Sequence, residues 1–130
     1  MESKQRLKFS IINKGCLIGN SLNYLVISKN SYNITSYVMI ALLNSILLDW
    51  RFRVTSTNNH INNYEIDDLP INIIIDKKNI NKLNLFVKKI QRNYNQKLRK
   101  EIELIVLKIF KAEKYLHYLI KNHPCGNILK

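Results

Sequence analysis

Side chains suited to contacting a polyanionic ligand are concentrated between Trp50 and Ile71. Two arginines are followed there by an unusual run of short hydroxyl and amide groups. A core does not hold so many of these groups, because each one buried without a partner costs roughly 1–3 kcal/mol. Asn can bond the adenine edge, Arg the guanine edge or a phosphate, and Ser or Thr either one. We therefore predict a DNA-facing loop whose candidate contact residues are Arg51, Arg53, Thr55, Ser56, Thr57, Asn58, Asn59, His60, Asn62, Asn63 and Tyr64.

Each of these candidates also has an ordinary structural interpretation, which the sequence leaves open. In an extended segment Arg51 and Arg53 would point to one side and contact DNA together, but either one can instead pair with an acidic neighbour such as Asp49 or Glu65. The residues from Thr55 to Asn59 can form a turn bonded to its own backbone. A histidine at position 60 can be structural, and the Tyr64 ring can pack internally as well as stack on a base.

The same stretch does not predict catalysis or metal binding. The string Asn59 to Asn63 superficially resembles part of a metal-dependent nuclease site, but such a site needs further His or acidic ligands at set spacing. The acidic residues Glu65, Asp67 and Asp68 have no matching nucleophile, so we interpret them as a solvated edge. We assign this chain no catalytic residue, no metal ligand and no cofactor of its own.

Composition agrees with a nucleic-acid partner. The 130 residues suffice for one domain, and 21 Lys and Arg against 9 Asp and Glu give a net charge of +12. Such an excess favours a polyanionic ligand, although an AT-rich genome also enriches lysine. Cys16 and Cys125 are too isolated to indicate a disulfide framework or a zinc site. The apolar stretch from Tyr37 to Leu48 is too short for a membrane span, and the start lacks a secretory signal, so we expect a cytoplasmic protein without a membrane partner.

The hydrophobic pattern predicts a helix-dominated α+β fold. Short strands are expected at Gln5–Ile12 and Ser21–Ser28, with Gly15 and Gly19 in their connection. Thr35 or Ser36 then caps a helix over Tyr37–Trp50, which is apolar on nearly every face and is therefore buried at the centre. The segment 61–75 is expected to be irregular or strand-like, because Pro70 limits pairing.

A basic helical extension is predicted to follow. Asp76 has the character of an N-cap, and apolar residues then recur at helical spacing. Asn93–Asn95 weakens the pattern, a second helix covers about 98–110, and Lys111–Glu113 is either a turn or a continuation. Helix then resumes to Lys121, and the Pro and Gly of 122–126 end it. The expected organisation is thus a first part over residues 1–75 and a helical extension over 76–130, whose lysines form a solvated face or follow a phosphate backbone.

Three stretches resemble the TaqI-like C-terminal specificity domain, the target-recognition part of adenine-specific DNA methyltransferases and of restriction enzymes fused to them. They are GCLIGNSLNYLVI (15–27), ALLNSILLDWRFRVTSTNNHINNYEIDDLPI (41–71) and EIELIVLKIFKAEKYLHYLI (101–120). Together they cover about half of the chain. The middle stretch is the most specific, because it joins a buried helix, an aromatic-Arg hinge and the polar loop in a fixed order.

The resemblance implies that residues 1–75 form a partial specificity domain. Such a domain packs against a methyltransferase catalytic domain, contacts double-stranded DNA and assists recognition and flipping of the target adenine. The Asn/Asp-Pro-Pro-Tyr/Phe motif of amino-methyltransferases is absent from this sequence, as is a glycine-rich cofactor loop. We therefore expect a fragment of a restriction-modification enzyme that does not methylate alone, with S-adenosylmethionine held by the partner domain. The alternatives are a small basic RNA-binding or ribosome-associated protein, and a non-functional remnant of the larger enzyme.

Overall fold

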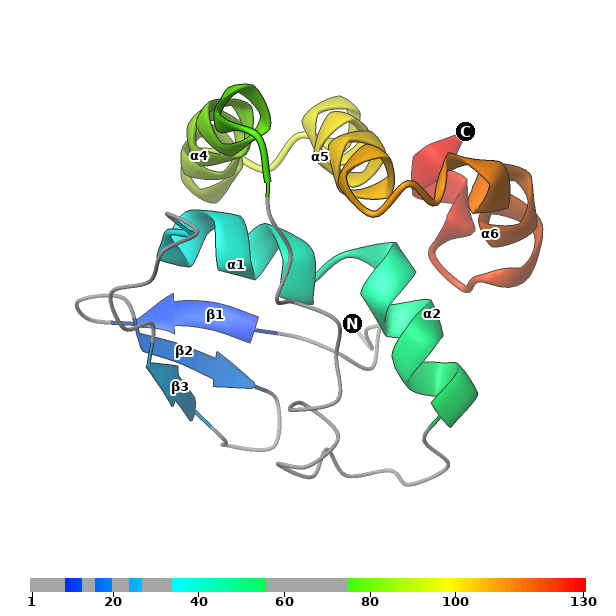
Figure 1. Ribbon diagram of the computed structural model, residues 1–130, viewed down its shortest axis with the longest axis horizontal. Helices are drawn as coiled ribbons and strands as arrows, with labels where there is room; N and C mark the ends of the chain where they lie inside the picture. Colours follow the sequence, from blue (N-terminus) through cyan, green and yellow to red (C-terminus); the bar gives the residue numbers. More distant parts are fainter. Residues whose placement is uncertain (1–8, 13–15, 20–23, 27–33, 56–74) are drawn as a thin grey trace.

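Helix α1 lies between a small sheet and a layer of outer helices (Figure 1). The computed structural model describes residues 9–12, 16–19, 24–26, 34–55 and 75–130. Within them the chain is a helix-dominated α+β protein, as predicted. Helix α1 (Ser36–Leu43) contacts β1 on one side and α4 and α5 on the other. This position explains a helix that is apolar all round, because Val38 through Leu43 are all buried.

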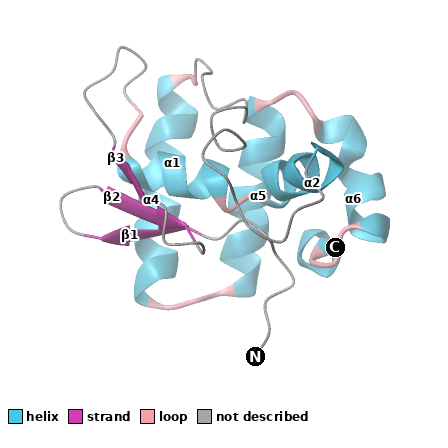
Figure 2. Ribbon diagram, turned by 90° about the horizontal axis from the view of Figure 1, so that it is seen from below, coloured by secondary structure: helices cyan, strands magenta, loops and turns pink. Residues whose placement is uncertain are grey.

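The sheet has three antiparallel strands in the order β1-β2-β3. They are β1 (Phe9–Ile12), β2 (Cys16–Gly19) and β3 (Tyr24–Val26), with Phe9 opposite Gly19 and Cys16 opposite Val26. Strands β1 and β3 fall within the two predicted strands. The interpretation of 16–19 as part of a connection was wrong, since Cys16–Gly19 pairs with both neighbours as the central strand. Figure 2 shows the sheet from the side opposite α1.

The single helix predicted over Tyr37–Trp50 is also wrong, because the chain breaks at Asn44 and Ser45 and begins α2 (Ile46–Thr55). Thr35 caps α1, as predicted, by accepting a hydrogen bond from the Val38 amide at 3.2 Å. The Ser45 hydroxyl donates to the Leu42 carbonyl at 2.7 Å and accepts from the Leu48 amide at 3.2 Å. One side chain thus closes α1 and caps α2, a role for which serine is well suited.

The outer layer starts with two helices that form a pair across α1. Asp76 caps α4 (Lys77–Arg92), as predicted, and Asn95 caps α5 (Gln96–Ile109) after the expected break. The apolar stripe of α4 faces inward, with Ile80, Leu83 and Val87 buried. One hydrophobic cluster joins α1, α2, α4, α5 and the residues that follow them.

Helix α5 ends in a turn at Phe110 and Lys111. Of the two interpretations left open for Lys111–Glu113, a turn and not a continuation of the helix is therefore correct. Lys111 adopts a left-handed conformation with φ of 54°, and the Ala112 amide reaches back to the Leu107 carbonyl at 2.8 Å. The chain continues as η1 (Glu113–Tyr115), α6 (Leu116–Asn122) and a final η2 (Gly126–Leu129). A Cβ at Gly126 would collide with the backbone carbonyls of Leu119 and Ile120, so this turn requires glycine.

Each helix among the described residues is too short or too polar to cross a lipid bilayer.

The Asn44 side chain ties β1 to the end of α1. Its amide donates to the Phe9 carbonyl at 2.8 Å, and its oxygen accepts from the Phe9 amide at 2.6 Å. We predict that Asn44→Ala lowers the free energy of unfolding by roughly 1–3 kcal/mol, because both backbone groups lose their partner. Urea denaturation measures the change. Asn81→Ala, at an exposed position of α4, is the control and should shift stability by less than about 0.5 kcal/mol; equal effects of both variants would contradict the prediction.

Candidate nucleic-acid interface

Helix α2 carries three of the predicted contact residues. The expectation that Arg51 and Arg53 lie in an extended segment was wrong, because α2 continues to Thr55. Side chains two apart on a helix point in widely different directions, so Arg51 and Arg53 do not form one face. Arg51 is exposed, whereas Arg53 is half-buried and donates from Nε to Asp49 Oδ2 at 2.8 Å. The ion pair with Asp49, one of the two structural interpretations, is therefore correct for Arg53.

Asp49 is the centre of a buried polar cluster between α2 and the segment after α6. Its carboxylate is fully buried, and its Oδ2 lies 2.8 Å from Arg53 Nε and 2.7 Å from His123 Nε2. The His123 side chain is also completely shielded from solvent. A buried carboxylate requires such partners, since an unpaired charge in the interior is very costly.

The hydrogen bonds of His123 identify its tautomer. Its Nδ1 accepts a hydrogen bond from the backbone amide of Cys125 at 3.0 Å, so that nitrogen carries no proton. The proton of the neutral ring is then on Nε2, from which it donates to Asp49. An Asp–His pair is common in active sites, but here both side chains are sealed from solvent and both ring nitrogens are engaged. We conclude that the pair is structural and fixes α2 against the chain beyond α6.

A second buried acid, Glu103 of α5, holds the joint between α1 and α2. Its Oε2 accepts from the Ile46 amide at 2.8 Å, and its Oε1 accepts from Arg99 Nε at 2.8 Å. Arg99 also donates from Nη2 to the Asn44 carbonyl at 3.2 Å. Arg99 therefore binds the Asn44 carbonyl at the end of α1, and Glu103 binds the Ile46 amide at the start of α2. Backbone groups at helix ends have no partner within the helix.

The pKa values of this pair are shifted by burial and by their mutual attraction. Burial raises the pKa of Glu103 above its ordinary value of 4.5, and the attraction of Arg99 offsets only part of that effect. For Arg99, burial alone would lower the pKa, but the Glu103 carboxyl group outweighs it and the pKa is raised. Arg99 is therefore permanently charged.

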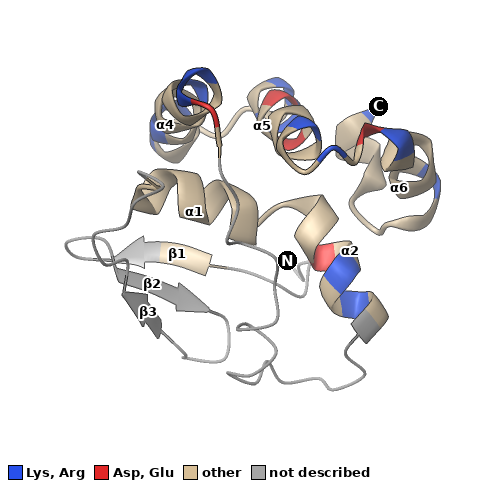
Figure 3. Ribbon diagram, viewed as in Figure 1, with Lys and Arg blue, Asp and Glu red and all other residues tan. Residues whose placement is uncertain are grey.

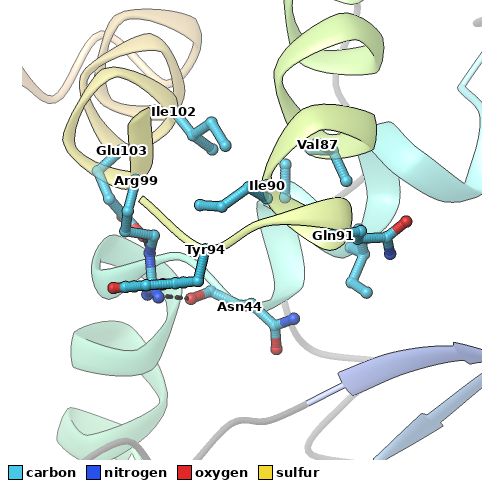
Figure 4. A pocket seen from close by; sticks show the side chains of 10 residues that line it. Asn44, Val87, Ile90, Gln91, Tyr94, Arg99, Ile102 and Glu103 are labelled. Carbon is cyan, nitrogen blue, oxygen red and sulfur yellow. Dashed lines mark hydrogen bonds and ion pairs between the residues drawn. The ribbon is translucent and has the colours of Figure 1, made fainter. Parts of the chain in front are cut away.

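A pocket of about 190 Å³ opens next to this pair, between α1, α4 and α5. Figure 4 shows Ile90, Ile102 and Val87 along its walls, with Tyr94, Arg99 and Asn44 together at one side. Its polar groups are largely engaged, since Asn44 binds Phe9 and Arg99 binds Glu103. The remaining lining is mainly apolar, so the pocket has no set of convergent polar groups that would define a ligand.

A partly exposed aromatic cluster lies where α2 meets η1 and α6. The Trp50 ring centroid is 5.7 Å from that of Tyr115 and 5.8 Å from that of Tyr118, in tilted and edge-to-face geometry respectively. Tyr115 is 38% exposed and Tyr118 is 49% exposed. The Lys114 ammonium lies 5.2 Å from the Tyr115 ring centroid. Sequence reasoning missed this cluster, because Trp50 is more than 60 residues away from the two tyrosines along the chain.

Positive charge is concentrated on the outer helices. Residues 75–130 contain 14 Lys and Arg against 4 Asp and Glu, a net charge of +10 out of +12 for the chain. Figure 3 shows Lys and Arg positions distributed along α4, α5 and α6. Two acids, Asp49 and Glu103, are buried and paired, so they contribute little negative potential at the surface.

Most of the predicted contact set lies outside the described residues, namely Ser56, Thr57, Asn58, Asn59, His60, Asn62, Asn63 and Tyr64. Thr55 ends α2, but its side chain also lies outside them. The structure therefore brings Arg51, Arg53 and Thr55 onto one helix and leaves the loop itself a prediction. In the described part of the chain, no group of three or more His, Cys, Asp or Glu side chains is arranged to hold a metal ion.

Comparison with protein-family models, with curated proteins and with solved structures found no match.

The buried Asp49–His123 pair can be tested by removing the ring. We predict that His123→Ala lowers the free energy of unfolding by roughly 1–3 kcal/mol, because Asp49 and the Cys125 amide each lose a buried partner. The effect stays below that of an isolated buried charge because Arg53 remains paired with Asp49. Thermal or urea unfolding provides the measurement. His117→Ala, at an exposed position of α6, is the matched control, and a similar loss in both variants would disprove the structural role.

Glu103 should give the protein a defined pH dependence. The folded-state pKa of Glu103 is raised above 4.5. Above pH 4.5, therefore, the Glu103 carboxyl group loses its proton in the unfolded chain but still holds it in the folded chain. Its contribution to stability therefore falls as pH rises from 4.5 towards the folded-state pKa. Glu103→Gln cannot titrate and should lack this decline, whereas Glu101→Gln, exposed on the same helix, should retain it. The free energy of unfolding is measured over a pH series; parallel curves for wild type and Glu103→Gln would refute the assignment.

Proposed function

We propose that this chain is a DNA-binding, target-recognition fragment of an adenine-specific restriction-modification methyltransferase. The resemblance of residues 15–27, 41–71 and 101–120 to the TaqI-like specificity domain supports this function. The observation that carries it is the end of α2, which takes an exposed Arg51 to the start of the amide-rich segment. Arg and Asn in such a segment are the residue types that contact phosphates and base edges.

The proposed DNA-contacting face is the end of the molecule formed by α2 and α6, which pack against each other. Arg51 of α2 and Lys114 and Lys121 around α6 are exposed there. In Figures 1 and 2, α4 lies at the opposite end of the molecule from α6. Arg53 supports this face indirectly, because its bond to Asp49 stabilises the last turns of α2.

Methyl transfer would belong to a partner domain or subunit. The resemblance implies a catalytic domain that holds S-adenosylmethionine, with the present chain supplying contacts to duplex DNA. The fragment is therefore proposed to bind DNA without modifying it.

Salt dependence tests this proposal. Wild-type protein should bind a blunt DNA duplex with an affinity that falls with salt, with a log–log slope of about −0.9 for each phosphate neutralised. The double variant Arg51→Ala, Lys121→Ala should flatten the slope by roughly 1.8. The matched control Lys78→Ala, Lys82→Ala removes two exposed cations from α4 and should leave the slope nearly unchanged. Fluorescence anisotropy of a labelled duplex gives both slopes.

Two results would count against the proposal. If no salt-sensitive duplex binding is found, the assignment as a DNA-binding fragment fails. If the α4 variant changes the slope as much as the α2–α6 variant does, the DNA-contacting face is misplaced.

A small basic RNA-binding protein is the second candidate, and the exposed Tyr115 and Tyr118 rings next to Trp50 are the observation that favours it. Readers of single-stranded RNA present aromatic rings on which unstacked bases lie. Competition separates the two functions: unlabelled duplex DNA should displace the labelled duplex more effectively than single-stranded RNA of equal length. The opposite order would favour the RNA-binding function.

A further inference from the structure

We propose that Tyr115, Tyr118 and Trp50 form a stacking platform for an unpaired nucleobase, with Lys114 and Lys121 binding the adjoining phosphates. This inference rests on the proposed function for its nucleic-acid partner. It shares Lys114 and Lys121 with the proposed DNA-contacting face and adds the three aromatic rings. The proposed ligand is a single-stranded segment, or an unpaired base within a duplex. Its base would lie against the tyrosine rings at the α2–α6 end.

The first argument is the exposure of the rings. Tyr115 and Tyr118 leave 38% and 49% of their surface in water, and Val54, four residues beyond Trp50 on α2, is 66% exposed. Trp50 packs against both tyrosines, so the rings are held in fixed orientations. Stacking on such rings favours binding of any sequence, because every base has a π-face.

The second argument is the position of the lysines, which distinguishes a nucleic acid from a protein partner. The Lys114 ammonium lies 5.2 Å from the Tyr115 ring centroid, and Lys121 follows Tyr118 by three residues on α6, a spacing that puts both side chains on the same side of that helix. Lysine is depleted in the cores of protein–protein interfaces, whereas ammonium groups beside stacking rings suit a sugar-phosphate backbone. Glu113 is the one exposed carboxylate among residues 111–123 of the described chain, so the cluster is net positive.

The third argument is the placement of the cluster. Trp50 immediately precedes Arg51 on α2, and the amide-rich segment starts beyond the end of the same helix. A nucleic-acid strand bound at Arg51 would therefore pass close to the aromatic rings. The buried Asp49–His123 contact holds α2 next to the residues around α6, so the platform does not depend on the ligand for its assembly.

The chain contains one tryptophan, which makes Trp50 fluorescence a reporter placed within the proposed site. Titration with a ten-nucleotide oligothymidylate should quench this fluorescence in the full chain. Tyr118→Ala should weaken binding about tenfold, equivalent to the loss of about 1.4 kcal/mol of stacking. Tyr118→Phe should bind like wild type, because it keeps the ring. Tyr94→Ala, a 62% exposed tyrosine between α4 and α5, is the control and should not change the affinity.

The outcomes separate this inference from the proposed function. The platform is overturned if the oligothymidylate does not quench Trp50 fluorescence and if Tyr118→Ala binds it as tightly as wild type. This holds even where the blunt duplex still binds with a salt-dependent slope. If the oligothymidylate binds and quenches while the duplex does not bind, the platform stands and the duplex-binding function fails. Equal losses in Tyr118→Ala and Tyr118→Phe would also overturn the platform, since the hydroxyl group rather than the ring would then be responsible.

Discussion

The joint between α1 and α2 is the constraint from which the rest of the structure follows. The Glu103 carboxyl group accepts a hydrogen bond from the Ile46 amide at the start of α2, and the Arg99 guanidinium donates one to the Asn44 carbonyl at the end of α1. A carboxyl group at a helix N-terminus also interacts favourably with the helix dipole. These contacts fix the angle at which α2 leaves the core, and α2 in turn determines where Trp50, Arg51 and the polar segment are presented.

Buried polar groups specify this fold as much as the apolar core does. The cluster around α1 makes burial favourable, but leucine and isoleucine side chains alone permit many similar packings. The hydrogen bonds of Asp49 to His123 and of Glu103 to the Ile46 amide form only when the helices take this arrangement. A different arrangement of the helices would leave a buried charge or a buried amide without a partner. The two acids therefore select a single position for α2 relative to α5 and α6, at some cost in desolvation.

Local patterns were enough to predict the elements whose signals are contained within a few turns of chain. Asp76 and the apolar stripe at Ile80, Leu83 and Val87 identified α4, and Thr35 marked the start of α1. The break at Asn44–Ser45 had a signal in its serine, but the apolar residues on both sides obscured it.

The candidate site was less predictable, because its supporting contacts are not local. Arg53 lies four residues from Asp49, and that pairing follows once α2 is known to reach Thr55. By contrast, no spacing rule links Asp49 with His123 or Trp50 with Tyr118, since chain topology alone brings them together. Most of the amide-rich segment lies outside the described residues. Its proposed DNA-binding role comes from residue chemistry and from the resemblance to the specificity domain.

The contact between Asp49 and His123 joins residues 74 positions apart, and this separation has a kinetic consequence. Closing a loop of that length costs more chain entropy than forming the turns of α1 or α4. Asp49 therefore remains hydrated while the local helices form, and it loses this water only when the His123 imidazole packs against it. We expect the seam between α2 and the final turns to close late during folding and to open early when denaturant is added.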